Sequence, residues 1–348
     1  MGTRQKKFAV IGAGIAGIAC ARTLVQAGHH ATLFEEGPEA GGRTATRDSP
    51  FGTFDHGAQY FTVRDERFAR ALETVPGLCR PWSANTVRVL DPLGRVAAAS
   101  LPPREPHWVP APGMQALAAR WAQPLAAAGA LELGTRVSAI ARDAVDASRW
   151  QLHTEGQDES LHVHSGFDAV MLAIPASRAR ALLQASRLAP RFIEQLAKVQ
   201  VAPCWTLMLA FPQAQQPSLA YIGPQWNAAR STHHRVAWLA RESSKPGRGP
   251  VERWTVQASA AWSQEHLEDD GARVKAKLLR AFSEITGVRA EPSHAEAFRW
   301  RNAQTLEPLG RTHLWDGKAQ IGLAGDWCLG HRVENAFVSG LELALAAA

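Results

Sequence analysis

The sequence predicts an α/β protein with a parallel sheet in its first domain and an α+β second domain inserted into that domain. Two short apolar runs, 8–11 and 31–34, have the composition of buried strands and enclose an apolar-periodic stretch that indicates a helix. The first run leads into a Gly-x-Gly-x-x-Gly turn at 12–17, and the second ends at Glu35. Strand, glycine turn, helix, strand and acid in this order are typical of a Rossmann-like unit that binds a dinucleotide.

The glycines and the acid of this unit have separate expected roles. Gly12 permits the tight turn, Gly14 lets the backbone approach a pyrophosphate at the helix N-terminus, and Gly17 lets the helix pack closely on the strand. Glu35 follows at about the twenty-residue offset where a carboxylate accepts hydrogen bonds from a ribose. The alternative is an ordinary glycine-rich turn with Glu35 exposed to solvent.

The later elements indicate that the chain leaves the first sheet and returns to it. Strands are expected at 135–142, 150–154 and 161–164, followed by a buried strand at 169–174 that ends before Pro175. A strand at 319–324 and a helix from 333 to the end complete the first domain. We therefore expect a discontinuous nucleotide domain of residues 1–75, 112–178 and 312–348, and a substrate domain of residues 76–111 and 179–311.

Composition excludes several classes of protein. The chain is 46% hydrophobic and 20% charged, as expected for a globular enzyme, and no apolar run reaches the roughly eighteen residues of a membrane span. Its net charge of +6 is scattered rather than clustered, which does not indicate nucleic-acid binding. The four cysteines lack metal-site spacing, so we expect no metal and a cytoplasmic location. The sequence leaves the oligomeric state open.

Two further motifs resemble parts of a flavin site. Gly41-Gly42-Arg43 follows soon after Glu35, and the planar fork of an arginine suits a diphosphate. Near the C-terminus, Gly325-Asp326 ends the returning strand and precedes the last helix. The Gly-Gly-Arg sequence resembles a motif of the FAD-dependent amine oxidase superfamily. In that superfamily the motif lies along FAD, and a C-terminal Gly-Asp binds the ribityl chain.

Within this superfamily the chain resembles the bacterial renalases over nearly its whole length. The more specific marks are Gly-Ala-Gln-Tyr-Phe at 57–61 and Gly-Asp-Trp-Cys at 325–328. The resemblance implies non-covalent FAD and removal of hydride from NAD(P)H isomers, which are dihydronicotinamide dinucleotides reduced at unusual ring positions, with O2 reoxidising the flavin to give H2O2. Together, motifs and resemblance predict these cofactor-binding residues: Gly12, Gly14, Ile15, Ala16, Gly17, Glu35, Glu36, Gly42, Arg43, Gln59, Tyr60, Val137, Gly325, Asp326, Val333 and Glu334.

The substrate side is predicted from two segments that the resemblance places near the flavin. We expect Arg241, Lys245, Arg299 and Trp300 to position the donor, because cations beside an aromatic plane suit a nicotinamide ring carried on a diphosphate. The chain departs from the renalase pattern, which tends to show histidine, tyrosine and asparagine where this chain has Phe298, Asn302 and Glu242. These departures concern the donor side of the site, whereas the motifs for the fold and the cofactor are complete.

Two other functions therefore remain open. An oxidase of amines or other small donors would need an aromatic cage and a lysine near the flavin, for which Lys198 and Lys245 are the candidates. The other alternative is a flavin-binding protein whose active site has lost its catalytic activity.

Overall fold

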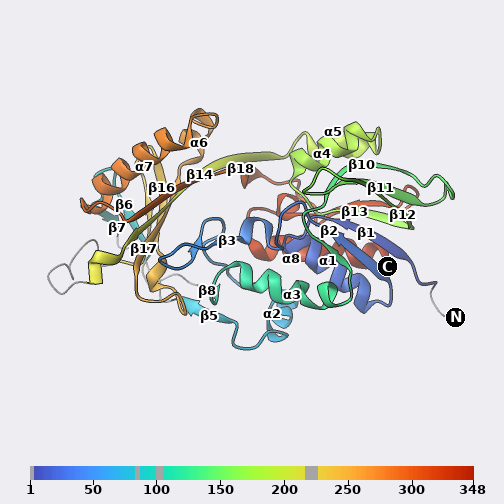
Figure 1. Cartoon of the computed structure of the whole chain (residues 1–348), viewed down its shortest axis with the longest axis horizontal. Helices are drawn as coiled ribbons and strands as arrows, with labels where there is room; N and C mark the ends of the chain where they lie inside the picture. The colour runs from blue at the N-terminus through green and yellow to red at the C-terminus, as the bar shows by residue number, and fades with distance from the viewer. Residues whose placement is uncertain (1–3, 83–86, 99–104, 216–225) are drawn as a thin grey trace.

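The computed structural model describes residues 4–82, 87–98, 105–215 and 226–348, and it has two sheet-based parts joined by long strands (Figure 1). In the first part, a six-stranded sheet has the order β19-β20-β13-β1-β2-β9. β1 pairs in parallel with both β2 and β13, β20 adds in parallel to β13, and β19 runs antiparallel at the edge. The bounds are β1 Lys7–Ile11, β2 His30–Phe34, β9 Leu131–Glu132, β13 Ala169–Leu172, β19 Leu314–Asp316 and β20 Ile321–Leu323.

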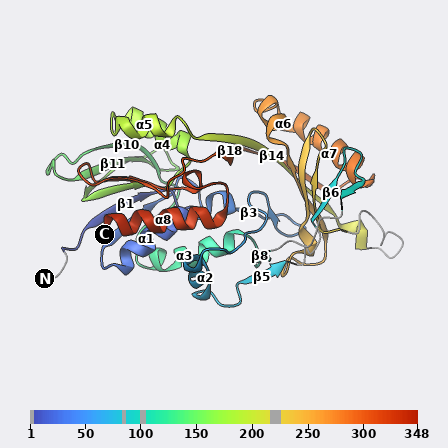
Figure 2. The ribbon, with the colours of Figure 1, turned by 180° about the vertical axis from the view of Figure 1, so that it is seen from behind.

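Helices cover one face of this sheet. They are α1 Ile15–Gln26, α3 Gln115–Ala127 and α8 Val333–Ala347, with α2 Glu66–Glu73 packed outside them. Seen from behind, the first and last helices of the chain lie side by side (Figure 2). A Cβ added at Gly340 of α8 would lie 2.0 Å from the carbonyl oxygen of Ala16 in α1, so this contact requires a residue without a side chain.

The other face carries a three-stranded meander and two helices (Figure 1). The meander is antiparallel, in the order β10-β11-β12, and the helices α4 and α5 share its apolar core. The bounds are β10 Arg136–Arg142, β11 Trp150–Glu155, β12 Leu161–Phe167, α4 Ala176–Ala185 and α5 Pro190–Leu196. The expected strands at 135–142, 150–154 and 161–164 therefore form a unit of their own beside the parallel sheet.

The second part is a mainly antiparallel seven-stranded sheet in the order β18-β14-β17-β16-β15-β6-β7. Helices α6 Ala260–Glu265 and α7 Gly271–Thr286 lie over it, and α7 buries Val274, Leu278 and Phe282 in its core. The long strands β14 and β18 extend from this sheet back toward the first part (Figure 1). The bounds are β6 Val87–Leu90, β7 Val96–Ala98, β14 Gln200–Phe211, β15 Ala228–Ser231, β16 Val236–Arg241, β17 Glu252–Ala258 and β18 His294–Glu307.

Two small ribbons lie between the parts. β3 Thr46–Arg47 pairs with β4 Phe54–Asp55, and β5 Cys79–Trp82 pairs with β8 His107–Pro110. In the described part of the chain, none of the helices combines the length and apolar character needed to span a bilayer.

The α/β fold with a mixed-sheet second part is confirmed, but one predicted domain boundary is wrong. The division between 178 and 179 would cut α4 in two. Ala179, Leu182 and Leu183 of α4 are buried in the same core as Val170 and Leu172 of β13, so α4 belongs to the nucleotide part. The chain contributes β6 and β7 to the second part before α3, and it enters that part again after α5, where β14 begins.

Candidate active site

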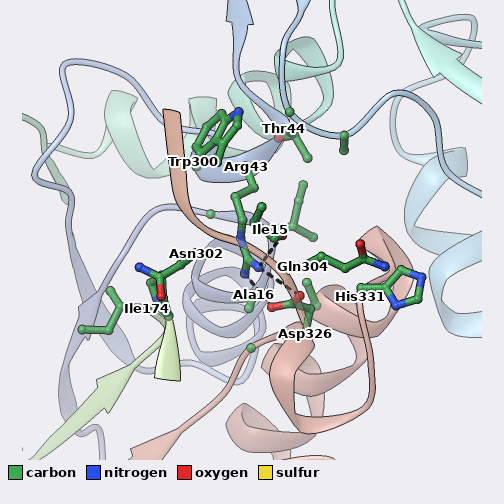
Figure 3. Close-up of a pocket in the computed structure, with 18 of the residues that line it drawn as sticks. Ile15, Ala16, Arg43, Thr44, Ile174, Trp300, Asn302, Gln304, Asp326 and His331 are labelled. Carbon is green, nitrogen blue, oxygen red and sulfur yellow. Dashed lines mark hydrogen bonds and ion pairs between the residues drawn. The ribbon is translucent and has the colours of Figure 1, made fainter. Parts of the chain in front are cut away.

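A cavity of about 1680 Å³ lies between the two parts of the molecule. One end is lined by Gly14 and Glu35 of the first βαβ unit, and the other by Tyr60 and Trp238 near the seven-stranded sheet. Figure 3 shows its middle region, where Arg43 and Asp326 meet below Trp300. The volume of the cavity exceeds the roughly 300–1,000 Å³ of an ordinary small-molecule pocket.

The glycine turn presents bare backbone to this cavity. Gly14 lines it immediately before α1, and a Cβ added at Gly14 would meet no protein atom within 4 Å. Gly41 forms an isolated bridge with Gly14, and a Cβ at Gly42 would lie 3.4 Å from the Gly14 Cα, so the second glycine loop lies directly on the first. Gly12 has φ +100°, a conformation that favours glycine. Open space at a helix N-terminus fits a diphosphate.

Gly17 has a different role from Gly14. It does not line the cavity, and a Cβ there would lie 1.8 Å from the carbonyl oxygen of Gly12. Gly17 therefore lets α1 pack on the turn, as its place in the motif predicts. A direct contact of Gly17 with the cofactor stays a prediction.

Glu35 ends β2 and lines the cavity beside the glycine turn. Its Oε2 accepts a hydrogen bond from the backbone N–H of Ala13 at 2.7 Å, and its Oε1 accepts one from Gly37 at 2.9 Å. Burial raises the pKa of Glu35, and these two backbone bonds oppose that shift. The next residue, Glu36, also lines the cavity and forms a two-bond pair with Arg178 at 2.6 and 2.5 Å.

Arg43 is held by a carboxylate of the protein. Its Nη1 donates to Oδ2 of Asp326 at 3.0 Å and its Nη2 donates to Oδ1 at 2.5 Å (Figure 3). Thr305 donates a third hydrogen bond to Asp326 at 3.1 Å. The fork of Arg43 is therefore directed at Asp326, and its contact with a diphosphate stays a prediction. The pair joins the Gly-Gly-Arg loop to the C-terminal Gly-Asp turn at the cavity wall.

The start of α8 also reaches the cavity, through Val333 and Ala336. Glu334 is buried and does not line the main cavity, so its contact with the cofactor stays a prediction. Its Oε1 instead accepts hydrogen bonds from the backbone N–H groups of Arg64 and Asp65 at 2.5 and 2.6 Å. Glu334 thus fixes the loop before α2 to the end of α8.

The structure places every other predicted cofactor residue in the cavity lining: Gly12, Ile15, Ala16, Gly42, Gln59, Tyr60, Val137 and Gly325, in addition to those already described. Stretches that are far apart in the sequence thus meet at one site.

Aromatic rings form the end of the cavity near the second sheet. The rings of Tyr60 and His107 stack with centroids 3.9 Å apart and planes 28° apart, and Trp238 lies 5.8 Å from Tyr60. Burial lowers the pKa of His107, and nearby Arg230 lowers it further, so this imidazole is neutral at pH 7. His107, Trp238 and Arg230 line the cavity but were not predicted as site residues. They lie on β8, β16 and β15 respectively, and the motifs of the sequence analysis do not include them.

Two of the four predicted substrate residues line the cavity. Trp300 is one of them. Its Nε1 donates a hydrogen bond to the carbonyl oxygen of His56 at 2.8 Å, and its ring stacks on the His56 ring with centroids 5.0 Å apart. Arg299 is the other, and its guanidinium lies over Trp205 at 5.5 Å. Asn302, one of the departures from the renalase pattern, also lines the cavity and accepts a hydrogen bond from Ser177 at 2.7 Å.

Lys245 and Arg241 do not line the cavity, so a contact of either residue with the donor stays a prediction. Lys245 is fully buried, with its Nζ 3.0 Å from Asp55 and 2.9 Å from Glu242. Arg241 lies 3.1 Å from Glu252, with its guanidinium over Trp254. Glu242 forms a buried ion pair with Lys245, so its carboxylate adds no charge to the cavity.

Phe298 and Lys198 also lie outside the cavity lining. Phe298 packs edge-on against His56, and Lys198 is exposed beyond α5. Among the described residues that line the cavity there is no lysine.

Comparison with known proteins agrees with this site. A family model described as flavin containing amine oxidoreductase matches residues 99–347, and an NAD(P)-binding Rossmann-like domain model matches residues 10–74. The chain belongs to the flavin-containing amine oxidoreductase family. Its cofactor is accordingly FAD, and the protein is an FAD-dependent oxidoreductase. The glycine turn, Glu35 and the start of α8 form a site that fits FAD, which is a dinucleotide.

Solved structures of other proteins share the fold. A proposed protoporphyrinogen oxidase from Exiguobacterium sp. 255-15 superposes with a TM-score of 0.76 over 99% of both chains, at 16% identity. Wild-type putrescine oxidase bound to putrescine superposes with a TM-score of 0.70 over 99% of both chains, at 12% identity. At such low identity these likenesses describe the fold, and they do not distinguish among the donors of the family.

Proposed function

We propose that this flavoenzyme oxidises isomeric dihydronicotinamide dinucleotides by hydride transfer, as the bacterial renalases do. When bound, FAD supplies a hydride acceptor that O2 can reoxidise with formation of H2O2. The side chains of the protein then have to bind an anionic dinucleotide, hold its ring flat and keep water away.

The charge of the cavity wall carries this proposal. The described lining residues include eight arginines but only four carboxylates, Glu35, Glu36, Glu105 and Asp326. The arginines are Arg43, Arg64, Arg136, Arg178, Arg230, Arg299, Arg301 and Arg332. A positive wall attracts diphosphates and opposes entry of a protonated amine, because low-dielectric walls concentrate the field in a cleft. This favours an anionic donor over an amine.

The aromatic end supports a flat heterocyclic donor. Tyr60, His107 and Trp238 offer ring faces, and such faces hold a planar ring by stacking rather than by a covalent or acid-base contact. A dihydropyridine is already a hydride donor, so the reaction requires no lysine or charged histidine near the ring. The cavity lining accords with this, since His107 is neutral at pH 7 and no lysine lines the described wall.

An oxygen-electrode assay with a panel of donors tests the proposal. We expect oxygen consumption and equimolar H2O2 with one or more purified isomers of NADH or NADPH, and slow turnover with putrescine. Rapid oxygen consumption with an amine and none with any isomer would refute the proposal and support amine oxidation. Failure of every donor, together with slow reoxidation of the photoreduced protein in air, would support a non-catalytic flavin protein.

A further inference from the structure

Two arginines of the cavity wall share one carboxylate that lies outside the wall. Arg301 donates from its Nη1 and Nη2 to the two oxygens of Glu268, at 2.5 and 2.8 Å. Arg299 donates to Oε2 of Glu268 at 3.2 Å and to the carbonyl oxygen of Leu267 at 2.7 Å. Both arginines line the cavity, whereas Glu268 comes from the connection between α6 and α7.

This arrangement differs from other arginine pairs in the wall. Arg43 and Arg178 each pair with a carboxylate of the lining, Asp326 and Glu36 respectively, so that one positive charge meets one negative charge. Arg299 and Arg301 instead share a single negative charge between two positive ones. The exposed fractions of the side chains are 68% for Glu268, 50% for Arg301 and 33% for Arg299, so this pairing occurs where solvent and ligand have access.

We propose that Glu268 is a specificity-determining residue that competes with the anionic groups of the donor for Arg299 and Arg301. The inference rests on the proposed function only in taking the donor to be anionic. A diphosphate offers the same planar contacts to an arginine fork as the carboxylate does. Its binding therefore has to replace part of the hydrogen bonding that Glu268 now supplies.

The charge on Glu268 is present under ordinary conditions. The hydrogen bond from Arg301 holds the pKa of Glu268 below its usual range, so the carboxylate is ionised at neutral pH. Replacing it by glutamine removes the negative charge while keeping an oxygen acceptor for the guanidinium groups. The cavity wall then becomes more positive without losing the shape of the α6–α7 connection, and anions should bind more tightly.

Equilibrium binding to the FAD-loaded enzyme tests this role without requiring turnover. The probes are ADP-ribose and inorganic pyrophosphate, which are anionic, and adenosine, which is uncharged, each followed by titration calorimetry. For Glu268→Gln we expect ADP-ribose and pyrophosphate to bind about two- to fivefold more tightly at low salt, the range set by exposed ion pairs. The gain should shrink at about 0.5 M NaCl, because salt screens exposed charges. Adenosine binding should not change.

Matched variants separate this effect from a general change in charge. Glu265→Gln removes an exposed carboxylate on the neighbouring helix α6 and should leave all three probes unaffected. Adding Arg301→Ala to Glu268→Gln should cancel most of the gain, because the acid acts through this arginine. Unchanged or weaker binding of both anions to Glu268→Gln would overturn the inference. Tighter anion binding, with no oxidation of any dihydronicotinamide isomer, would support the role of Glu268 and refute the proposed donor.

Discussion

Replacing Lys245 by methionine should destabilise the protein without acting on the donor directly. The Lys245 ammonium lies in a cluster whose side chains have no exposed surface, 3.0 Å from Asp55 and 2.9 Å from Glu242. Arg248 supplies the second cation of the cluster, but its Nη2 contacts Asp55, at 2.6 Å. Without Lys245, the hydrogen bond that Thr255 donates to Glu242 at 2.8 Å remains, but no cation contacts this carboxylate.

The size of the effect follows from these contacts, because Lys245 contacts both carboxylates whereas Arg248 contacts Asp55. Removing one partner of a buried ion pair costs about 3–5 kcal/mol, because the remaining charge stays desolvated. The cost should fall mainly on Glu242, so the double variant Lys245→Met/Glu242→Gln should recover a large part of the lost stability. Lys198→Met is the matched control, since Lys198 is exposed, and should change the free energy of unfolding by less than about 0.5 kcal/mol.

The loss should also depend on pH in a defined direction. Burial raises the pKa of Glu242 above its ordinary 4.5, and Lys245 opposes that rise. In Lys245→Met the opposing charge is gone, so the folded protein holds a proton on Glu242 to higher pH than the unfolded chain does. A group of this kind favours the folded state at low pH and loses that contribution as pH rises through its folded pKa. The difference from wild type should therefore be larger at pH 8 than at pH 5.5.

Urea unfolding of the FAD-saturated proteins at both pH values measures these differences. The reasoning would be refuted by a cost below about 1 kcal/mol at pH 8, or by a cost that does not fall toward pH 5.5. Normal stability with abolished flavin reduction would instead mean that Lys245 acts on the reaction, as the sequence had predicted.

Four further predictions follow from the cavity. Gly14→Val should give folded protein without flavin colour, because its side chain meets no protein atom and enters the cavity. Gly17→Ala should instead fold poorly, because its side chain would clash with Gly12. Flavin absorbance and circular dichroism distinguish the two variants. Glu35→Gln should raise the dissociation constant of FAD tenfold or more, since charge-assisted bonds contribute about 1.5–3 kcal/mol each; an equal constant would mean that Glu35 does not contact the ribose. Arg299→Ala should slow flavin reduction at low concentrations of the dinucleotide donor, with less effect on a mononucleotide; equal effects would argue against a diphosphate contact. Acid precipitation should release all of the flavin into the supernatant, and colour kept in the pellet would reveal a covalent bond.

The local elements of the fold were predictable from the sequence because short-range rules govern them. The strand, glycine turn and helix at the N-terminus follow from apolar patterning and from the space that Gly14 and Gly17 leave. The predicted domain boundary between 178 and 179 was wrong because the hydrophobic pattern of a sequence does not show which sheet a helix packs against. Only the tertiary structure shows that α4 shares a core with β13.

The cofactor end was easier to predict than the donor end for a related reason. Gly14 and Glu35 act through local geometry that a motif encodes. Lys245 and Arg241 were predicted from a segment that the family resemblance places near the flavin. The structure instead pairs Lys245 with Asp55 and Glu242 in a buried cluster, and it pairs Arg241 with Glu252. His107 and Trp238 reach the cavity through strand pairings between distant segments, and no spacing in the sequence indicates them.

Anaerobic mixing of the purified protein with borohydride-reduced NAD tests the central claim most directly. This mixture contains the unusual dihydronicotinamide isomers together with ordinary NADH, and purified NADH alone is the control. We predict rapid bleaching of the visible absorbance of the oxidised flavin, with formation of NAD⁺, and much slower bleaching with NADH alone. No bleaching by the mixture, with rapid bleaching by putrescine or another simple amine, would contradict the account.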